Sequence, residues 1–292
     1  MRIVRTVVEL RRELSPRDGR RSVGLVPTMG AFHEGHLSLM RAARERCDLV
    51  VVSLFVNPAQ FGDGGDLSAY PRDEARDAAL AEAEGVDVLF APPVEEVYPD
   101  GFDTTVHVGG LAGTLEGAHR PGHFDGVATV VTKLFNAVQP HVAFFGRKDA
   151  QQVAVVRRLV ADLDLPVQID VRPTVRDADG LALSSRNARL SAEERRRALG
   201  LNEALNAFTV NAVAGHTVDE SLDAARAKLD GVEVEYLVAV DPETFRAAET
   251  FEGEVLVAVA ARVGDVRLID NTIVQPADAL HAEAAKGIPC NA

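Results

Sequence analysis

The chain has 292 residues, of which 47% are apolar and 26% are charged, a composition typical of a soluble globular protein of one or two domains. Its formal net charge of −13 argues against nucleic acid as a general partner, because a phosphate backbone is bound by a basic surface. A small anionic ligand in a locally basic cleft is still compatible with this charge.

The cysteines and the apolar runs predict a cytoplasmic protein without a membrane segment. Cys47 and Cys290 are the only cysteines, which is typical neither of a disulfide framework nor of a cysteine zinc site. The N-terminus has no secretory apolar region. The longest nearly apolar run, 49–56, is far too short to span a bilayer.

The first part of the chain alternates between predicted strands and helices. Residues 1–22 read as a strand and a charged helix that ends near Asp18. Further apolar runs predict strands at 23–26, 48–56, 86–90, 141–145 and 166–171. The segments between them predict helices at 35–46, 70–84, 126–138 and 149–161, the last capped by Asp149. A mostly irregular stretch, 91–121, has one short strand near 104–108. This alternation predicts a parallel sheet.

After residue 172 the pattern changes. Charged helices are predicted at 191–208 and 217–230, followed by strands at 232–240, 255–263 and 266–270. The last two strands are joined by Gly264-Asp265, a two-residue hairpin signal. We therefore predict an α/β fold with a Rossmann-like parallel-sheet domain over 1–174. A smaller C-terminal α+β domain covers 175–292, with a Ser-Ser-Arg loop at the hinge and a flexible tail from about Pro276.

One motif lies where a strand turns into a helix: the sequence Pro-Thr-Met-Gly-Ala-Phe-His-Glu-Gly-His at 27–36. His33 and His36 are at the helix start, where free backbone N–H groups and the helix dipole attract anions. This favours a polyphosphate site. Two alternatives are a surface histidine pair and a metal site, although the zinc-protease motif needs its histidines four residues apart.

Polar residues also follow three other predicted strands, at 57–62, 146–152 and 173–187. Ligands of open α/β sheets bind at such carboxyl ends. Lys148 is placed to meet a phosphate as a point charge, and Ser184-Ser185-Arg186 can clamp one with hydroxyl and guanidinium donors. Gln60 and Gln152 would suit a small hydroxy acid. Each of these side chains, taken alone, could be an ordinary surface or capping residue.

The complete ordered set resembles the pantoate–β-alanine ligases (pantothenate synthetases), nucleotidyltransferase relatives that share a His-x-Gly-His signature with class I aminoacyl-tRNA synthetases. The residues that carry the resemblance are 27–36, Phe55–Phe61, Tyr70–Arg72, Arg120–Val127, Phe144–Gln152 and Leu183–Asn187. His-x-Gly-His alone is a weak signal, whereas the ordered set is highly specific.

The resemblance implies a two-step ligation with ATP and Mg²⁺. Pantoate's carboxylate attacks the α-phosphate of ATP to give pantoyl adenylate and pyrophosphate, and the amine of β-alanine then displaces AMP to give pantothenate. Catalysis of this kind depends on positioning and charge stabilisation. The resemblance also implies a homodimer and a C-terminal domain that closes over ATP.

Carried over by position, His33, His36 and Lys148 would be catalytic, with His36 the proton donor. The residues expected to bind ATP are Met29, Gly30, Ala31, Phe32, His33, Glu34, Gly35, His36, Gly146, Arg147, Lys148, Asp149, Val175, Leu183, Ser184, Ser185 and Arg186. Those expected to bind pantoate are Gln60, Gln152 and Asn57, and Gln60 would also border β-alanine. Tyr70 and Arg120 are further candidates.

The chain departs from the family pattern at three positions. Arg147 stands where Glu is expected, Ala150 where an aromatic residue is usual, and Leu183 where Met is common, a nearly volume-neutral exchange. The Mg²⁺ ligands stay open; nearby acidic candidates are Asp73, Glu74 and Asp77.

Competing functions are a nucleotidyltransferase that makes a dinucleotide, a catalytically dead nucleotide-binding regulator and a zinc hydrolase. The two glutamines argue against the first. The intact His33, His36 and Lys148 argue against the second.

Overall fold

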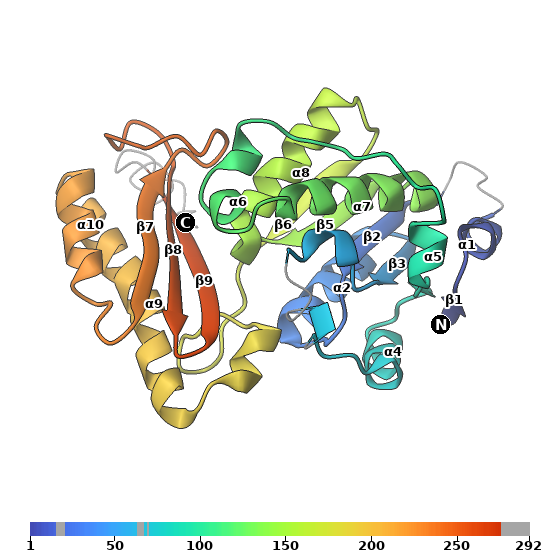
Figure 1. Cartoon of the computed structure of the whole chain (residues 1–292), viewed down its shortest axis with the longest axis horizontal. Helices are drawn as coiled ribbons and strands as arrows, with labels where there is room; N and C mark the ends of the chain where they lie inside the picture. The colour runs from blue at the N-terminus through green and yellow to red at the C-terminus, as the bar shows by residue number, and fades with distance from the viewer. Residues whose placement is uncertain (16–20, 63–66, 69, 276–292) are drawn as a thin grey trace, which may run out of the picture. The chain divides into compact units, whose positions relative to one another are not determined.

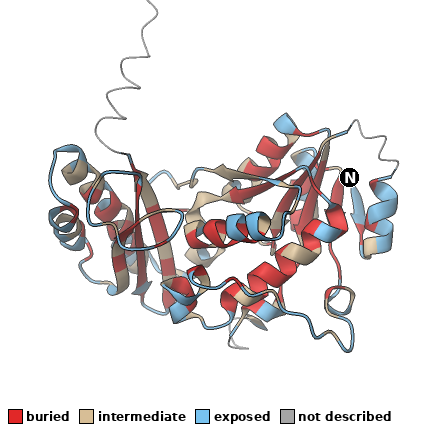
Figure 2. Cartoon of the chain, turned by 90° about the horizontal axis from the view of Figure 1, so that it is seen from above, coloured by how far each residue is buried: buried red, intermediate tan, exposed pale blue. Residues whose placement is uncertain are grey.

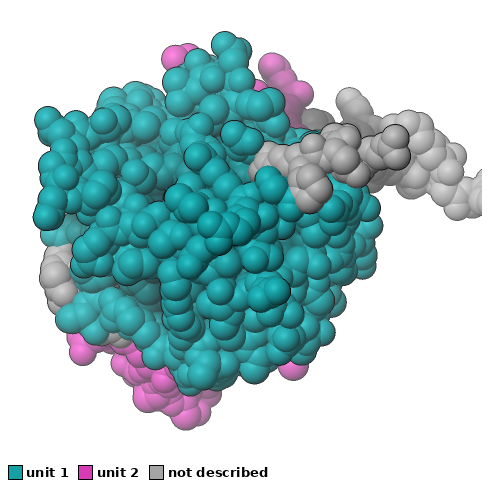
Figure 3. All heavy atoms as spheres, turned by 90° about the vertical axis from the view of Figure 1, so that its right-hand side faces the viewer, with its two compact units in different colours: residues 1–175, 183–185 teal, residues 176–182, 186–292 magenta. Residues whose placement is uncertain are grey.

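The computed structural model describes residues 1–15, 21–62, 67–68 and 70–275. The chain divides into two compact units, coloured separately in Figure 3. The first comprises residues 1–175 and 183–185, and the second comprises 176–182 and the chain from 186 onward. The Ser-Ser-Arg loop is therefore shared, with Ser184 and Ser185 in the first unit and Arg186 in the second.

The first unit is built on a six-stranded parallel sheet in the order β1-β4-β3-β2-β5-β6 (Figure 1). Every neighbouring pair runs parallel, for example Val26 beside Val52. The strands are β1 Arg2–Val4, β2 Val23–Thr28, β3 Leu49–Leu54, β4 Val88–Phe90, β5 Val142–Gly146 and β6 Gln168–Arg172. The order from β4 to β6 is that of a Rossmann-like sheet, so the predicted fold class is confirmed.

Helices cover both faces of this sheet. They are α1 Val7–Glu13, α2 Glu34–Arg46, α4 Glu74–Ala83, α5 Val94–Val97, α6 Glu116–His119, α7 His123–Val138 and α8 Ala150–Asp162. Helices α7 and α8 pack together on one face, and α2 and α4 pack on the other (Figure 1). Figure 2 shows the buried residues concentrated in the strands and on the sides of the helices that face them. Strands buried on both faces explain the nearly continuous apolar runs in the sequence.

Two local predictions in this unit are wrong. Residues 104–108 form no strand; the Val106 N–H donates to the Thr129 hydroxyl of α7 at 3.0 Å instead of to a neighbouring strand. Asp149 stands at the N-cap position of α8, but its side chain makes no capping hydrogen bond. Residues Arg147–Asp149 already turn as a short 3₁₀ helix, η3, so α8 is entered from a helical turn rather than from the extended backbone that favours side-chain capping. The predicted end of the first helix near Asp18 lies outside the described residues.

The second unit packs α9 Ala192–Val213 and α10 Val218–Arg226 against an antiparallel sheet. Its strands, in the order β7-β8-β9, are β7 Glu233–Val240, β8 Val255–Val263 and β9 Val266–Val274. Both helices begin with a capping box, at Ser191 and Thr217. Gly264, at φ +58°, forms the predicted hairpin turn between the paired Val263 and Val266. The predicted tail from Pro276 lies outside the described residues.

Candidate active site

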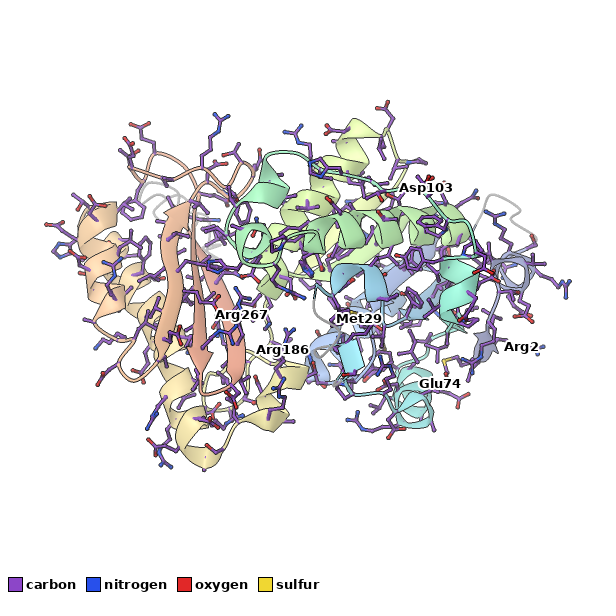
Figure 4. All side chains as sticks on the ribbon, viewed as in Figure 1. Arg2, Met29, Glu74, Asp103, Arg186 and Arg267 are labelled. Atoms are coloured by element: carbon purple, nitrogen blue, oxygen red, sulfur yellow. The ribbon has the colours of Figure 1, made fainter. Side chains whose placement is uncertain are left out.

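The order in which strands are added to the sheet reverses between β2 and β5, so this is its topological switch point. Strands β3 and β4 follow on one side of β2, whereas β5 and β6 lie on the other side. In such sheets the crevice at the carboxyl ends of the two central strands is the usual ligand site. The loop from Met29 to His33 leaves β2 at this point, and η3 leaves β5. Met29 is labelled in Figure 4 just beyond the end of β2.

The loop after β2 has an unusual backbone conformation that a buried carboxylate holds in place. Gly30 and Ala31 have φ values of +92° and +53°, and the second is uncommon for a residue with a side chain. Asp77 of α4 is 1% exposed. Its two carboxylate oxygens accept the N–H groups of Ala31 at 2.7 Å and Phe32 at 2.8 Å. Asp77 therefore ties the loop to a helix that comes more than forty residues later in the chain.

Phe32 anchors the same loop from the inside. Its side chain is 1% exposed and belongs to the core between the sheet and α2, together with Met40 and Phe144. The sequence placed Phe32 among the residues that line the nucleotide, and the burial of its ring restricts it to a backbone contribution.

The two histidines interlock at the start of α2. His33 is the N-cap, and its Nδ1 accepts the Gly35 N–H at 3.2 Å. The Nδ1 of His36 accepts the His33 N–H at 3.3 Å. The ring centroids are 4.2 Å apart. Because a backbone N–H can only donate, each Nδ1 is an acceptor, and a neutral ring then has its proton on Nε2.

The charge state of His36 follows from its surroundings. Burial lowers its pKa to about 3, and the nearby His33 and Lys148 contribute to the lowering. At pH 7 His36 is therefore neutral and presents an N–H donor at Nε2. Lys148, half-buried on η3, is the cation whose field reaches His36. The ends of β2 and β5 thus bring a neutral donor and a positive charge together.

A second part of the candidate site follows β3, in the 3₁₀ turn η1 Pro58–Gln60. Asn57 is 1% exposed, and its amide has four hydrogen bonds. Its Oδ1 accepts from the Ala59 N–H at 3.3 Å and the Tyr98 hydroxyl at 2.7 Å. Its Nδ2 donates to the Gly126 carbonyl at 3.1 Å and to Gln60 Oε1 at 3.0 Å. An amide oxygen and NH₂ group offer four positions, so none is left for direct contact with a substrate.

Gln60 is held through both its side chain and its backbone. It is 8% exposed, and its Nε2 lies 3.1 Å from Met29 Sδ. Its carbonyl lies 2.9 Å from His123 Nδ1 and 3.5 Å from the Arg120 guanidinium. Burial, with the charge of Arg120, lowers the pKa of His123 to about 4, so this ring is neutral at pH 7. Because a carbonyl only accepts, the Nδ1 of His123 has the proton.

The other predicted residues are distributed over both units. Gln152 is half-buried in the first turn of α8. Leu183, Ser184 and Ser185 belong to the same unit as β2, and the Leu183 N–H donates to the Val175 carbonyl at 3.0 Å. Glu34 is exposed and paired with Arg41. Tyr70 packs edge-on against Phe61. Arg186 belongs to the second unit.

Sequence reasoning missed several residues that support the site. Gln151, rather than its neighbour Gln152, is buried and accepts the Glu116 N–H at 3.0 Å while its amide nitrogen donates to the carbonyls of Leu111 and Thr114. Tyr98 and His123 were also unassigned. His123 could have been found, because it lies within the Arg-Pro-Gly-His stretch that the resemblance includes. Tyr98 has no sequence signal of its own.

The acidic candidates for a metal site are already engaged. Asp73 caps α4 by accepting the Arg76 N–H at 3.0 Å, Glu74 pairs with Arg5, and Asp77 holds the loop after β2. Within the described ranges, no group of three or more His, Cys, Asp or Glu side chains is arranged to hold a metal ion. In the same part of the chain, no helix is both long and apolar enough to cross a membrane.

Comparison with known proteins decides between the functions that the sequence left open. The family model of pantoate-beta-alanine ligase matches residues 2–273. The chain belongs to the pantoate–β-alanine ligase family. Its relatives include pantothenate synthetases from Acidobacterium capsulatum, 52% identical over 94% of this chain and 97% of the relative, and from Cereibacter sphaeroides, 55% identical over 92% and 98%.

Solved structures of the family agree with the fold. Pantothenate synthetase from Thermus thermophilus matches with a TM-score of 0.90 and 50% identity over 94% of this chain and all of that one. A pantoate-beta-alanine ligase from Francisella tularensis, complexed with beta-gamma ATP and beta-alanine, matches with a TM-score of 0.79 and 33% identity over 94% and 97%. The chain is an enzyme with the family's activity, the ATP-dependent ligation of pantoate and β-alanine.

Proposed function

We propose that both steps of the ligation occur at the carboxyl ends of β2 and β5. In the first step a carboxylate oxygen of pantoate forms a bond to the α-phosphorus of ATP, and the bond to the pyrophosphate oxygen breaks. In the second step the β-alanine nitrogen forms the amide bond, loses a proton and displaces AMP. The observation that carries this proposal is that Lys148, after β5, is near enough to His36, after β2, for its charge to contribute to the lowered pKa of His36.

The nucleotide would lie against the loop after β2 and against η3. We assign its phosphates to His33, His36 and Lys148, with Lys148 at the α-phosphate, where negative charge accumulates during attack. With a pKa of about 3, His36 is almost never in its protonated form at neutral pH, so we assign it a hydrogen bond from Nε2 rather than the proton transfer expected from the resemblance. Gly146 and Asp149 are proposed at the ribose, and Val175 at adenine.

Pantoate would lie between η1 and the first turn of α8, held by Gln60 and Gln152. We assign Asn57 to positioning Gln60, because all four of its hydrogen-bonding positions are occupied within the protein. Gln60 would also border β-alanine, whose amine must reach one face of the acyl carbonyl group of the adenylate before AMP leaves.

The remaining assignments rest on the resemblance. We propose that Leu183 to Ser185, with Arg186 from the second unit, bind ATP phosphates as the C-terminal domain closes, and that the enzyme is a cytoplasmic homodimer. Mg²⁺ would neutralise ATP phosphates. The described residues contain no group of three or more potential ligands, so it would be held by phosphate oxygens, water and at most one or two carboxylates, as Mg²⁺ usually is.

ATP–pyrophosphate exchange tests the first step directly. With ATP, Mg²⁺ and labelled pyrophosphate, label should enter ATP only when pantoate is present, and it should do so without β-alanine. Exchange independent of pantoate, or exchange that needs a mononucleotide instead, would refute an acyl-adenylate mechanism at this site. Light scattering during size-exclusion chromatography gives the oligomeric state in the same preparation.

A further inference from the structure

We propose that Tyr98 and Asn57 form a relay that fixes the orientation of the Gln60 amide, so that Gln60 can only donate hydrogen bonds to the substrate. Tyr98 and Asn57 are positioning residues in this view, because neither needs to touch pantoate. The inference rests on the proposed function, in which Gln60 binds pantoate. It explains which chemical groups of a substrate can bind to Gln60.

The orientation of Asn57 is set by two backbone groups whose roles are unambiguous. The Ala59 N–H can only donate, so the atom of Asn57 beside it is the oxygen. The Gly126 carbonyl can only accept, so the atom beside it is the nitrogen. An amide flip would set donor against donor at one end and acceptor against acceptor at the other. At 1% exposure, Asn57 has no water to compensate for such a mismatch.

The fixed amide of Asn57 passes its orientation to Gln60. The second N–H of Asn57 Nδ2 points at the Gln60 amide at 3.0 Å, so the Gln60 atom nearest to it must be the acceptor Oε1. Gln60 Nε2 is then turned the other way, toward Met29 Sδ at 3.1 Å. A thioether is a weak acceptor, so an oxygen of a ligand would readily replace it.

Tyr98 is the other member of the relay, and it acts on Asn57. Since Asn57 Oδ1 is an acceptor, the Tyr98 hydroxyl donates to it, at 2.7 Å. Burial raises the pKa of Tyr98 to about 12, so the hydroxyl keeps its proton at physiological pH. The ring is held between Phe55 and Phe102, at centroid distances of 6.2 and 5.1 Å, and Lys133 Nζ lies 5.9 Å from the ring centroid. The aromatic ring is therefore well supported and its hydroxyl points at Asn57.

This arrangement selects the chemistry of the bound group. A carboxylate or hydroxyl oxygen can accept from Gln60 Nε2, whereas an ammonium group would meet another donor. Pantoate presents oxygens and β-alanine presents an ammonium group at neutral pH. β-Alanine also has a carboxylate, so the relay excludes only its ammonium end from this position, whereas every polar group of pantoate can accept from Gln60 Nε2.

The first test is Tyr98→Phe in the full-length enzyme, followed by AMP formation. Loss of one buried hydrogen bond should raise the KM for pantoate about threefold to tenfold. The KM for ATP should stay within about twofold, because the phosphate-binding residues are not in the relay. Tyr236→Phe in the second unit is the matched control and should leave both constants unchanged. Equal increases in both constants for Tyr98→Phe would refute a role specific to Gln60.

The second test replaces the hydrogen-bond donor that Gln60 turns toward the substrate with an acceptor. Asn57→Asp keeps the shape but puts an acceptor opposite Gln60 Oε1, so the Gln60 amide should flip and turn its oxygen toward the substrate. Gln60→Glu places acceptors there without changing the buried Asn57. Both variants should raise the KM for pantoate more than Tyr98→Phe does. An unchanged KM in Gln60→Glu would overturn the donor-only assignment even if Asn57→Asp failed to fold.

A double-mutant cycle separates the relay from the proposed site. If Tyr98 acts through Gln60, Tyr98→Phe should have no further effect on the KM for pantoate in a Gln60→Ala background. Additive effects would refute the relay while leaving Gln60 as a pantoate ligand. If Gln60→Ala itself does not change the KM for pantoate, the proposed pantoate site fails, and the relay fails with it.

Discussion

The Nδ1 atom of His36 accepts the backbone N–H of His33 over 3.3 Å, so the first histidine of the pair orients the second. The bond closes one turn at the start of α2, where orphan N–H groups otherwise need a partner. It also leaves Nε2 as the donor of the neutral ring. The His-x-Gly-His motif therefore acts both as a helix cap and as a source of oriented donors.

The lowered pKa of His36 predicts a pH dependence of stability. The folded-state pKa is about 3 and an unfolded histidine titrates near 6.5, so the unfolded state binds more protons between these values. The contribution of His36 to stability is present above about pH 6.5 and is lost as the pH falls toward 3. His36→Gln should reduce the decrease in unfolding free energy between about pH 7 and about pH 4.5, measured by urea denaturation.

His216→Gln is the control for this measurement, because His216 is exposed in the second unit. Its denaturation curves should show the wild-type decrease at the lower pH. Part of the pH dependence of the unfolding free energy should remain in His36→Gln, because the pKa of His123 is also lowered. An unchanged pH dependence in His36→Gln would contradict the lowered pKa of His36.

Lys148→Ala should lower kcat by about a hundredfold to a thousandfold, because it removes the cation proposed to stabilise the charge on the α-phosphate. The side chain is only half-buried, so the melting temperature should change little. His36→Ala should likewise remain folded with most activity lost. Lys228→Ala, an exposed lysine of the second unit, provides the control. A Lys148→Ala protein that is unfolded would favour a purely structural role.

Asp77→Asn should weaken ATP binding, because it replaces one of two acceptors for the Ala31 and Phe32 N–H groups with a donor. The folded conformation of the loop would be destabilised by about 1–3 kcal/mol, the free-energy cost of a buried polar group without a hydrogen-bond partner. The KM for ATP should rise and the unfolding free energy should fall. Asp73→Asn on the same helix is the matched control, since asparagine caps a helix as well as aspartate does. Normal ATP binding by Asp77→Asn would show that the loop does not depend on this carboxylate.

Gly126→Ala should destabilise the protein even though alanine is the better helix former by about 1 kcal/mol. A Cβ atom at this position of α7 would lie 2.3 Å from the Ala59 carbonyl oxygen, so η1 must move. We expect a loss of about 1–3 kcal/mol by denaturation and a higher KM for pantoate, since Gln60 ends the same turn. Gly113→Ala has no atom within 4 Å of its Cβ and should affect neither quantity. Retention of wild-type stability by Gly126→Ala would mean that η1 can shift away from the new Cβ with little loss of unfolding free energy.

The alternation of apolar runs and amphipathic segments was sufficient to predict the parallel sheet, the second α+β region and the Gly264-Asp265 hairpin, because these depend on local periodicity and turn chemistry. Element ends were less predictable. Helix α4 begins at Glu74 rather than Tyr70, since Asp73 provides the cap. Strand β9 continues to Val274, because it pairs along the full length of β8.

By itself, the sequence determined that polar groups suited to phosphate and to a small hydroxy acid follow the ends of neighbouring strands, and its ordered motifs identified the family. Only the tertiary structure decided how those groups are oriented. Asp77 reaches Ala31, and Tyr98 reaches Asn57, across more than forty residues of chain in each case. Hydrogen-bond direction depends on which donors and acceptors the folded backbone brings within about 3 Å, and no sequence spacing contains that information.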